Sequence, residues 1–73
     1  MAGPRRSHTR VLVNTRLYQV VHGHAPRGVR SWGFSMGERT GLFWVHDAAY
    51  GDAKEQATRR ARTLGVTYVT VLP

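Results

Sequence analysis

The sequence contains no cysteine, only four acidic residues and no long apolar run. Without cysteine the chain can form no disulfide framework, zinc knuckle or thiol nucleophile, which fits a reducing compartment. No apolar stretch approaches the roughly 20 residues that cross a bilayer, and no signal-peptide core follows the basic start. We therefore expect a cytoplasmic protein that does not engage a membrane.

Positive charge is what the sequence has in excess. Ten of its 11 basic residues are Arg, and the formal net charge is +7 over 73 residues. A charge of this density attracts polyanions such as DNA, RNA, anionic lipid or an acidic protein face. The alternative is that Arg-rich codon usage produced a basic protein with another kind of partner. Abundant Arg, Ala, Gly and Val suggest a GC-rich genome, such as that of an actinobacterium or one of its phages.

The length suffices for one domain, which at this size buries only roughly 60% of the surface that its unfolded chain exposes. Residues 1–10 include Arg5, Arg6 and Arg10 and have no apolar periodicity, so they predict a flexible basic arm. Such an arm tracks phosphates or enters a minor groove; the alternative is a solubilising tail. Residues 11–73 are predicted to form a single small α+β domain.

Alternating apolar residues and β-formers predict three antiparallel strands ahead of a helix. They are Arg16–His22 with Val11–Val13 as a short lead-in, Val29–Met36, and Leu42–His46. In the third strand, Trp44 and His46 alternate with Phe43 and Val45. Gly37–Gly41 supplies the turn between the last two strands.

The helix prediction rests on its two ends and on one small-residue face. Asp52 and Glu55 have capping-box spacing, and Gly65 is expected to stop the helix. The small-residue face consists of Ala53, Ala57, Ala61 and Leu64. The β-branched segment Val66–Leu72 predicts a final strand.

Together these elements predict an α+β fold of order β-β-β-α-β. It comprises a three-stranded antiparallel sheet, one packed helix and a fourth C-terminal strand that pairs in parallel beside the first. The helix would then cover one face of the sheet and leave the other face open, which is where function is expected.

Aromatic side chains are numerous for a domain of this size. They are Tyr18, Trp32, Phe34, Phe43, Trp44, Tyr50 and Tyr68. On an open sheet such rings stack with unpaired bases, whereas in small α+β domains they fill the core. Because the helix face is lined with Ala, the sheet must supply the bulk of the core. We therefore favour a core role, with a secondary apolar patch on the opposite face as the alternative.

Basic residues outside the arm are expected to lie on or beside the sheet. A sheet that carries Arg can enter a major groove, where Arg reads guanine O6 and N7. Solvated surface Arg is the alternative for each residue. The complete predicted nucleic-acid-binding set is Arg5, Arg6, Arg10, Arg16, Arg27, Arg30 and Arg39.

No catalytic or metal motif emerges from the sequence. His22 and His24 are too close for the usual helical pair of ligands, and no Cys or nearby acidic residue completes a tetrahedral set. His46 and Asp47 form no triad with an evident nucleophile. Gly37–Gly41 does not match a phosphate-binding loop. We expect neither an enzyme nor a bound metal or cofactor.

The element order between Arg16 and Leu64 resembles the arm-binding amino-terminal domain of phage tyrosine recombinases. The residues that carry the likeness are Trp32, Trp44, Ala53, Ala57 and Ala61. The resemblance implies a three-stranded sheet that docks into the DNA major groove while a helix braces its back. A fourth strand after the helix departs from that pattern. The chain is also similar to small uncharacterised bacterial and phage domains with a hairpin Trp and a Val-rich final strand.

Charge and architecture together predict a small stand-alone nucleic-acid-binding module whose ligand is DNA. The alternative is a protein-interaction module, such as a phage factor that docks on a host protein or a virion component. An exposed edge strand would then add to the partner's sheet, and the basic charge would steer the module to an acidic protein partner.

Overall fold

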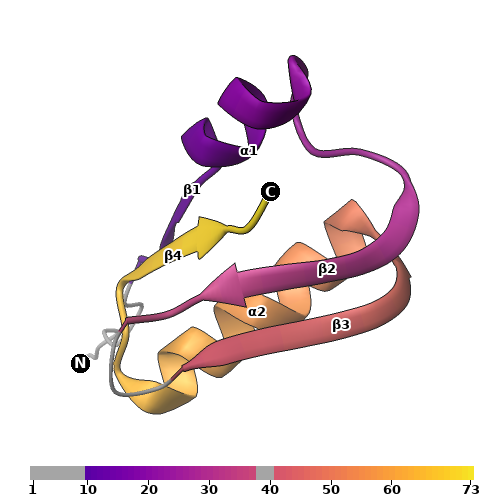
Figure 1. Cartoon of the computed structure of the whole chain (residues 1–73). Helices are drawn as coiled ribbons and strands as arrows, with labels where there is room; N and C mark the ends of the chain where they lie inside the picture. The colour runs from indigo at the N-terminus through magenta and orange to yellow at the C-terminus, as the bar shows by residue number, and fades with distance from the viewer. Residues whose placement is uncertain (1–9, 38–40) are drawn as a thin grey trace.

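A computed structural model describes residues 10–37 and 41–73 of the chain. Its two helices and four strands follow one another as β-α-β-β-α-β (Figure 1). In chain order they are β1 Leu12–Asn14, α1 Arg16–His22, β2 Val29–Ser35, β3 Leu42–Ala49, α2 Tyr50–Leu64 and β4 Tyr68–Val71. The strands form one mixed sheet with α2 packed behind it in Figure 1, which confirms the predicted α+β class.

The sheet has the spatial order β1-β4-β2-β3. β4 pairs in parallel with β1 and antiparallel with β2, and β2 pairs antiparallel with β3. The parallel pairing of the last strand with the first is as the sequence predicted, whereas its position inside the sheet, between β1 and β2, was not predicted. The antiparallel group of three consists of β3, β2 and β4, and the additional strand is β1.

The prediction of a strand over Arg16–His22 is wrong, because this segment is helix α1. The lead-in proposed over Val11–Val13 corresponds instead to the true first strand, β1. Asn14 Oδ1 accepts a hydrogen bond from the Arg16 backbone N–H at 2.9 Å and turns the chain out of β1. One turn on, Tyr18 and His22 stack with their ring centroids 4.1 Å apart, a contact between residues i and i+4 that a helix allows.

The capping box predicted at Asp52 is wrong as well, because α2 already begins at Tyr50, the N-cap position is Ala49, and no side chain caps the helix. β3 runs directly into α2, and the Tyr50 N–H donates a hydrogen bond to the Gly28 carbonyl at 3.1 Å. This contact satisfies a first-turn donor that a cap would otherwise serve. Asp52 still lies in the first turn, where its negative charge interacts favourably with the positive end of the helix dipole.

The predicted stop at Gly65 is confirmed. Gly65 adopts the left-handed conformation with φ 75°. Its N–H donates to the Arg62 carbonyl at 3.1 Å, and the Val66 N–H donates to the Ala61 carbonyl at 2.8 Å. These two bonds form a Schellman motif, which satisfies the last carbonyls of α2 before the chain enters β4.

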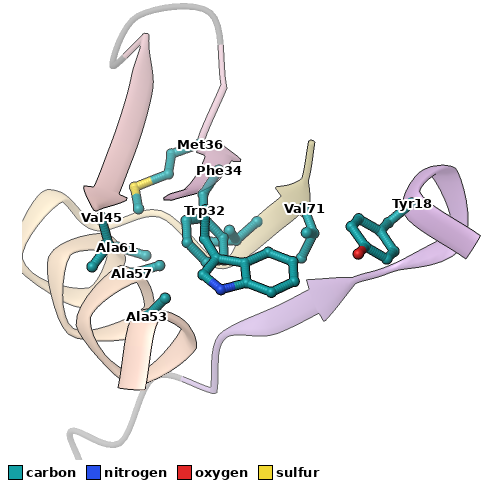
Figure 2. Packing of buried hydrophobic residues seen from close by; sticks show 10 residues of the cluster. Tyr18, Trp32, Phe34, Met36, Val45, Ala53, Ala57, Ala61 and Val71 are labelled. Atoms are coloured by element: carbon teal, nitrogen blue, oxygen red, sulfur yellow. The ribbon is translucent and has the colours of Figure 1, made fainter. Parts of the chain in front are cut away.

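The hydrophobic core lies between the sheet and α2, with Tyr18 from α1 closing one end (Figure 2). Its buried members are Tyr18, Trp32, Phe34, Met36, Val45, Ala53, Ala57, Ala61, Val69 and Val71. The three α2 alanines have no exposed surface, so the helix lies close to the strands while Trp32 and Phe34 supply the volume. The Trp32 indole N–H donates to the Ala48 carbonyl at 3.0 Å, which satisfies its polar atom within the core.

A β-bulge interrupts the pairing of β2 and β3. Arg30 pairs with Ala48 and Trp32 pairs with Val45, so β3 uses one residue more than β2 between these pairs. Within the bulge, Asp47 has a φ of 53°, a conformation that few residues other than glycine adopt.

No helix in the described residues, 10–37 and 41–73, is long and apolar enough to span a membrane. Most of the predicted basic arm lies outside the described residues, including Arg5 and Arg6. The turn residue Arg39 lies outside them as well.

Candidate nucleic-acid interface

The side of the sheet opposite α2, which we term the open face, is not covered by any described helix. Side chains alternate along each strand, so the residues next to the buried ones face away from the core. The open face consists of Leu12, Asn14, Val29, Ser31, Gly33, Ser35, Leu42, Trp44, His46, Ala49, Tyr68, Thr70 and Leu72. The large apolar members of this set are strongly exposed: Leu12, Val29, Leu42, Trp44 and Tyr68.

Trp44 lies across the centre of the open face because its neighbour on β2 has no side chain. Gly33 pairs with Trp44, and a Cβ built on Gly33 would lie 2.7 Å from the Trp44 ring and 2.9 Å from the Leu72 Cδ1. The indole therefore rests on the backbone of β2 and beside Leu72. It is still 48% exposed, so one side of the ring remains accessible to a ligand.

His46 extends this aromatic surface along β3. Its ring is nearly parallel to the indole of Trp44, at an interplanar angle of 8° with centroids 6.4 Å apart. His46 Nδ1 lies 3.0 Å from Ser31 Oγ on β2, which fixes the orientation of the imidazole. Ser31 and His46 form a serine–histidine contact, but no described acidic group hydrogen-bonds to the imidazole to complete a triad.

Tyr68 is the second exposed aromatic ring of the open face. It begins β4 opposite Leu12, and 51% of its surface is exposed. The Asn14 side-chain amide donates a hydrogen bond to the Tyr68 hydroxyl. This bond leaves the ring with less rotational freedom than a free surface tyrosine has.

Formal charge is absent from the described strand positions of the open face, which hold neither Arg, Lys, Asp nor Glu. Arg10, two residues before Leu12, and Arg16 and Arg27 in and after α1 are all exposed. None of these three forms an ion pair with a described carboxylate. Three of the predicted basic residues are thus exposed before β1 and in and after α1, while Arg5, Arg6 and Arg39 lie outside the described residues.

Arg30 differs from the other predicted residues because it projects on the core side of the sheet. Its guanidinium carbon lies 5.0 Å from the ring centroid of Trp32 and 5.9 Å from that of Tyr18. Such cation–π contacts stabilise a partly exposed Arg by about 0.5–1 kcal/mol. Arg30 therefore covers the end of the core beside α1, where part of its charge still faces solvent.

The described Asp and Glu residues lie near one another where β3 meets α2. Asp47, Asp52 and Glu55 line one shallow concavity between β3 and the first turns of α2. Glu55 also pairs with Arg59 at 3.2 Å on the outer surface of α2. His46 lines the same concavity and Asp47 follows it directly on β3, so this negative charge lies at the β3 edge of the open face.

The histidines assemble no metal site in the part of the chain that the structure describes. His22 and His24 have ring centroids 6.0 Å apart, and no third His, Cys, Asp or Glu joins a group with them. His22 Nε2 instead lies 3.2 Å from the Pro73 carbonyl oxygen.

Tyr50 packs its ring edge-on against the indole of Trp32. Burial raises the pKa of the Tyr50 hydroxyl.

Comparison of the chain with protein-family models, curated proteins and solved structures found no match. The resemblance to phage recombinase arm-binding domains therefore stays a prediction. Of the three strands on which it rested, Val29–Met36 and Leu42–His46 correspond to β2 and β3, and Arg16–His22 is helical.

The aromatic residues of the open face are absent from the binding residues predicted from charge. The alternation of Trp44 and His46 with Phe43 and Val45 already separates the two faces of β3. What the sequence could not show is that Gly33 lies directly beside Trp44, because that contact depends on the register of β2 against β3. The favoured core role is correct for Tyr18, Trp32 and Phe34, while Trp44 and Tyr68 form the patch that was the alternative.

Proposed function

We propose that the protein is a small nucleic-acid-binding module of the cytoplasm, with DNA as its ligand, in a phage or an actinobacterial host. The observation that carries this proposal is the combination of exposed Arg residues with an exposed aromatic sheet face. Arg10, Arg16 and Arg27 are exposed before β1 and in and after α1, and the described Asp and Glu residues share one concavity between β3 and α2. A polyanion with flat apolar bases matches both features of this surface.

Arg10, Arg16 and Arg27 are the described residues assigned to phosphate contact. Each is exposed and lies next to the sheet or to α1 rather than on the outer surface of α2. Every phosphate that such a residue neutralises releases condensed counterions, so affinity falls as salt rises. Arg5, Arg6 and Arg39 are proposed to add to this set.

The test is a salt titration of binding to short duplex and single-stranded DNA, followed by fluorescence anisotropy. The log–log slope is expected to be about −0.9 per neutralised phosphate for duplex and about −0.7 for single strands. Replacing Arg10, Arg16 and Arg27 together by Ala should make the slope shallower by about three times this per-phosphate value. Absence of binding to DNA and RNA at about 50 mM salt would overturn the proposal, since electrostatic binding is strong there.

A matched control removes the same amount of charge from the outer surface of α2. Lys54, Arg60 and Arg62 are exposed on that helix, away from the open face. Their triple replacement by Ala lowers the net charge equally, so it should weaken long-range attraction. The log–log salt slope should nevertheless stay as steep as that of the wild type. Equal slopes for the two triple variants would show that Arg10, Arg16 and Arg27 do not form the phosphate contacts.

A second candidate function, docking on a protein partner, is favoured by the outer surface of α1. Leu17, Val20 and Val21 lie at helical spacing and are 46%, 73% and 59% exposed. The outer edges of β1 and β3 are also unpaired within the described sheet, so either could accept a partner strand. Capture of one defined host protein that survives nuclease treatment and high salt would support this function instead.

A further inference from the structure

We infer that the open face binds single-stranded nucleic acid by stacking unpaired bases on Trp44 and Tyr68, an inference that rests on the proposed function. Both rings lie on the uncovered side of the sheet and retain about half of their surface for a ligand. Aromatic side chains on such surfaces stack with bases of any sequence, because every base presents a π face.

Trp44 is held in a stacking geometry before any ligand arrives. Its ring lies against the sheet over Gly33 and meets the Leu72 side chain, so it cannot turn into the core. The parallel ring of His46 and its hydrogen bond to Ser31 support the same orientation from the next outward position on β3. Little side-chain freedom is lost on binding, which favours affinity.

Trp44 and Tyr68 are too far apart to share one base. Trp44 pairs with Gly33, and Gly33 accepts a hydrogen bond from the Leu72 N–H, which marks one row across the sheet. Tyr68 lies four residues from Leu72 along the chain and two strands from β3. With about 3.3 Å per residue and about 4.8 Å between strands, the two backbones lie on the order of 16 Å apart. Each ring would therefore stack a separate base of the same strand.

Charge identifies the occupant as nucleic acid. An apolar sheet face alone would suit many ligands, but this one belongs to a chain of net charge +7. Arg10 adjoins the β1 side of the face, and the described carboxylates lie in the concavity between β3 and α2. The sugar–phosphate backbone can thus reach cations at the margin while bases contact the uncharged centre.

Unpaired bases suit the open face better than a duplex does. A duplex presents phosphates and base edges, which Arg side chains read, whereas its π faces are stacked inside. The described strand positions of the open face hold no Arg or Lys to read base edges. Its exposed groups are aromatic rings and aliphatic side chains, which contact faces rather than edges.

The experiment compares wild-type protein with Trp44→Ala and Tyr68→Ala. The probes are an oligo-dT strand of about 12 nucleotides, within the range that small single-strand binders cover, and its duplex with oligo-dA. Each variant should lose about 5- to 100-fold in affinity for the single strand. Affinity for the duplex should not change, and Trp44→Phe should recover most of the loss.

Leu64→Ala is the control for loss of an exposed apolar side chain, because Leu64 is 42% exposed at the end of α2, outside the open face. It should bind oligo-dT as the wild type does. Circular dichroism of each variant verifies folding, and quenching of Trp44 fluorescence by oligo-dT gives a second readout in the unmutated protein. Trp32 is 1% exposed, so its emission should not respond.

The possible outcomes separate this inference from the proposed function. If the wild type binds both probes and the aromatic variants bind oligo-dT unchanged, stacking is overturned while nucleic-acid binding stands. If the wild type binds neither probe, both proposals fail, and the open face would then serve a protein partner. Selective loss of oligo-dT binding in Trp44→Ala and Tyr68→Ala supports stacking.

Discussion

Asp47 adopts a backbone conformation that most side chains avoid. Its φ of 53° places it in the left-handed region, at the residue that gives β3 one more position than β2. Asp and Asn tolerate this region better than other non-glycine residues, because their short polar side chains bond locally. The identity of this residue therefore helps to set the bulge, which contains His46 and follows Trp44 along β3.

Substitution of Asp47 tests this conformational requirement. Asp47→Val should lower the free energy of unfolding by about 1–3 kcal/mol, since a β-branched residue is strained at positive φ. Asp47→Gly should leave stability equal or slightly higher, because glycine adopts this conformation without strain. Urea denaturation measures both variants, with Asp47→Asn as the conservative control. A valine variant as stable as the wild type would contradict the argument.

The sequence was least informative about α1 among the elements. Val20 and Val21 are β-formers, and they suggested a strand over Arg16–His22. Tertiary contacts decide otherwise: Tyr18 must be buried against Trp32, and a helix brings His22 onto the same ring. Intrinsic preferences of roughly 1 kcal/mol per residue cannot outweigh the burial of a large aromatic side chain.

The other elements were predictable because local and tertiary signals agree there. The alanine spacing of α2 and its stop at Gly65 both indicate one helix, and the structure has it over Tyr50–Leu64. Only its start was misplaced, since the Tyr50–Gly28 contact that replaces a cap joins residues far apart in the sequence. The pairing of β2 with β3 followed from alternation and a glycine-containing turn, but its bulge left no sequence signal beyond Asp47.

The close approach of α2 to the sheet depends on small side chains. Ala57 lies midway along the helix and has no exposed surface. Ala57→Leu should force the helix away from Phe34 and neighbouring core residues and cost about 1–3 kcal/mol of unfolding free energy. Gln56→Leu puts the same side chain at the adjacent, exposed position and should change stability by less than about 0.5 kcal/mol. Similar losses in the two variants, measured by chemical denaturation, would contradict close helix–sheet packing.

At the scale of the whole molecule, the net charge of +7 both attracts polyanions and opposes folding. Like charges repel more strongly in the compact state than in the extended chain. Composition alone indicated this excess and the class of ligand that it attracts. It did not indicate that Asp47, Asp52 and Glu55 line one concavity, because that grouping arises only when β3 turns into α2.

Added salt is expected to stabilise the free protein. The screening length shortens from about 30 Å at 0.01 M to about 10 Å at 0.1 M, comparable to distances between charges on a domain of this size. The thermal unfolding midpoint should therefore rise over this interval, while nucleic-acid affinity falls. Differential scanning fluorimetry in sodium chloride measures the midpoint. A midpoint that falls with salt would show that attractive charge pairs outweigh the repulsion.

β4 occupies an interior position of the sheet although it is the last strand along the chain. During synthesis, β1, β2 and β3 leave the ribosome without the strand that joins β1 to the hairpin. Val69 and Val71, both fully buried, are added to the core only at that stage. The sheet can therefore be completed only after residues 68–71 have emerged. Until then the edge of β2 that pairs with β4 stays unpaired and accessible to chaperones or to other nascent chains.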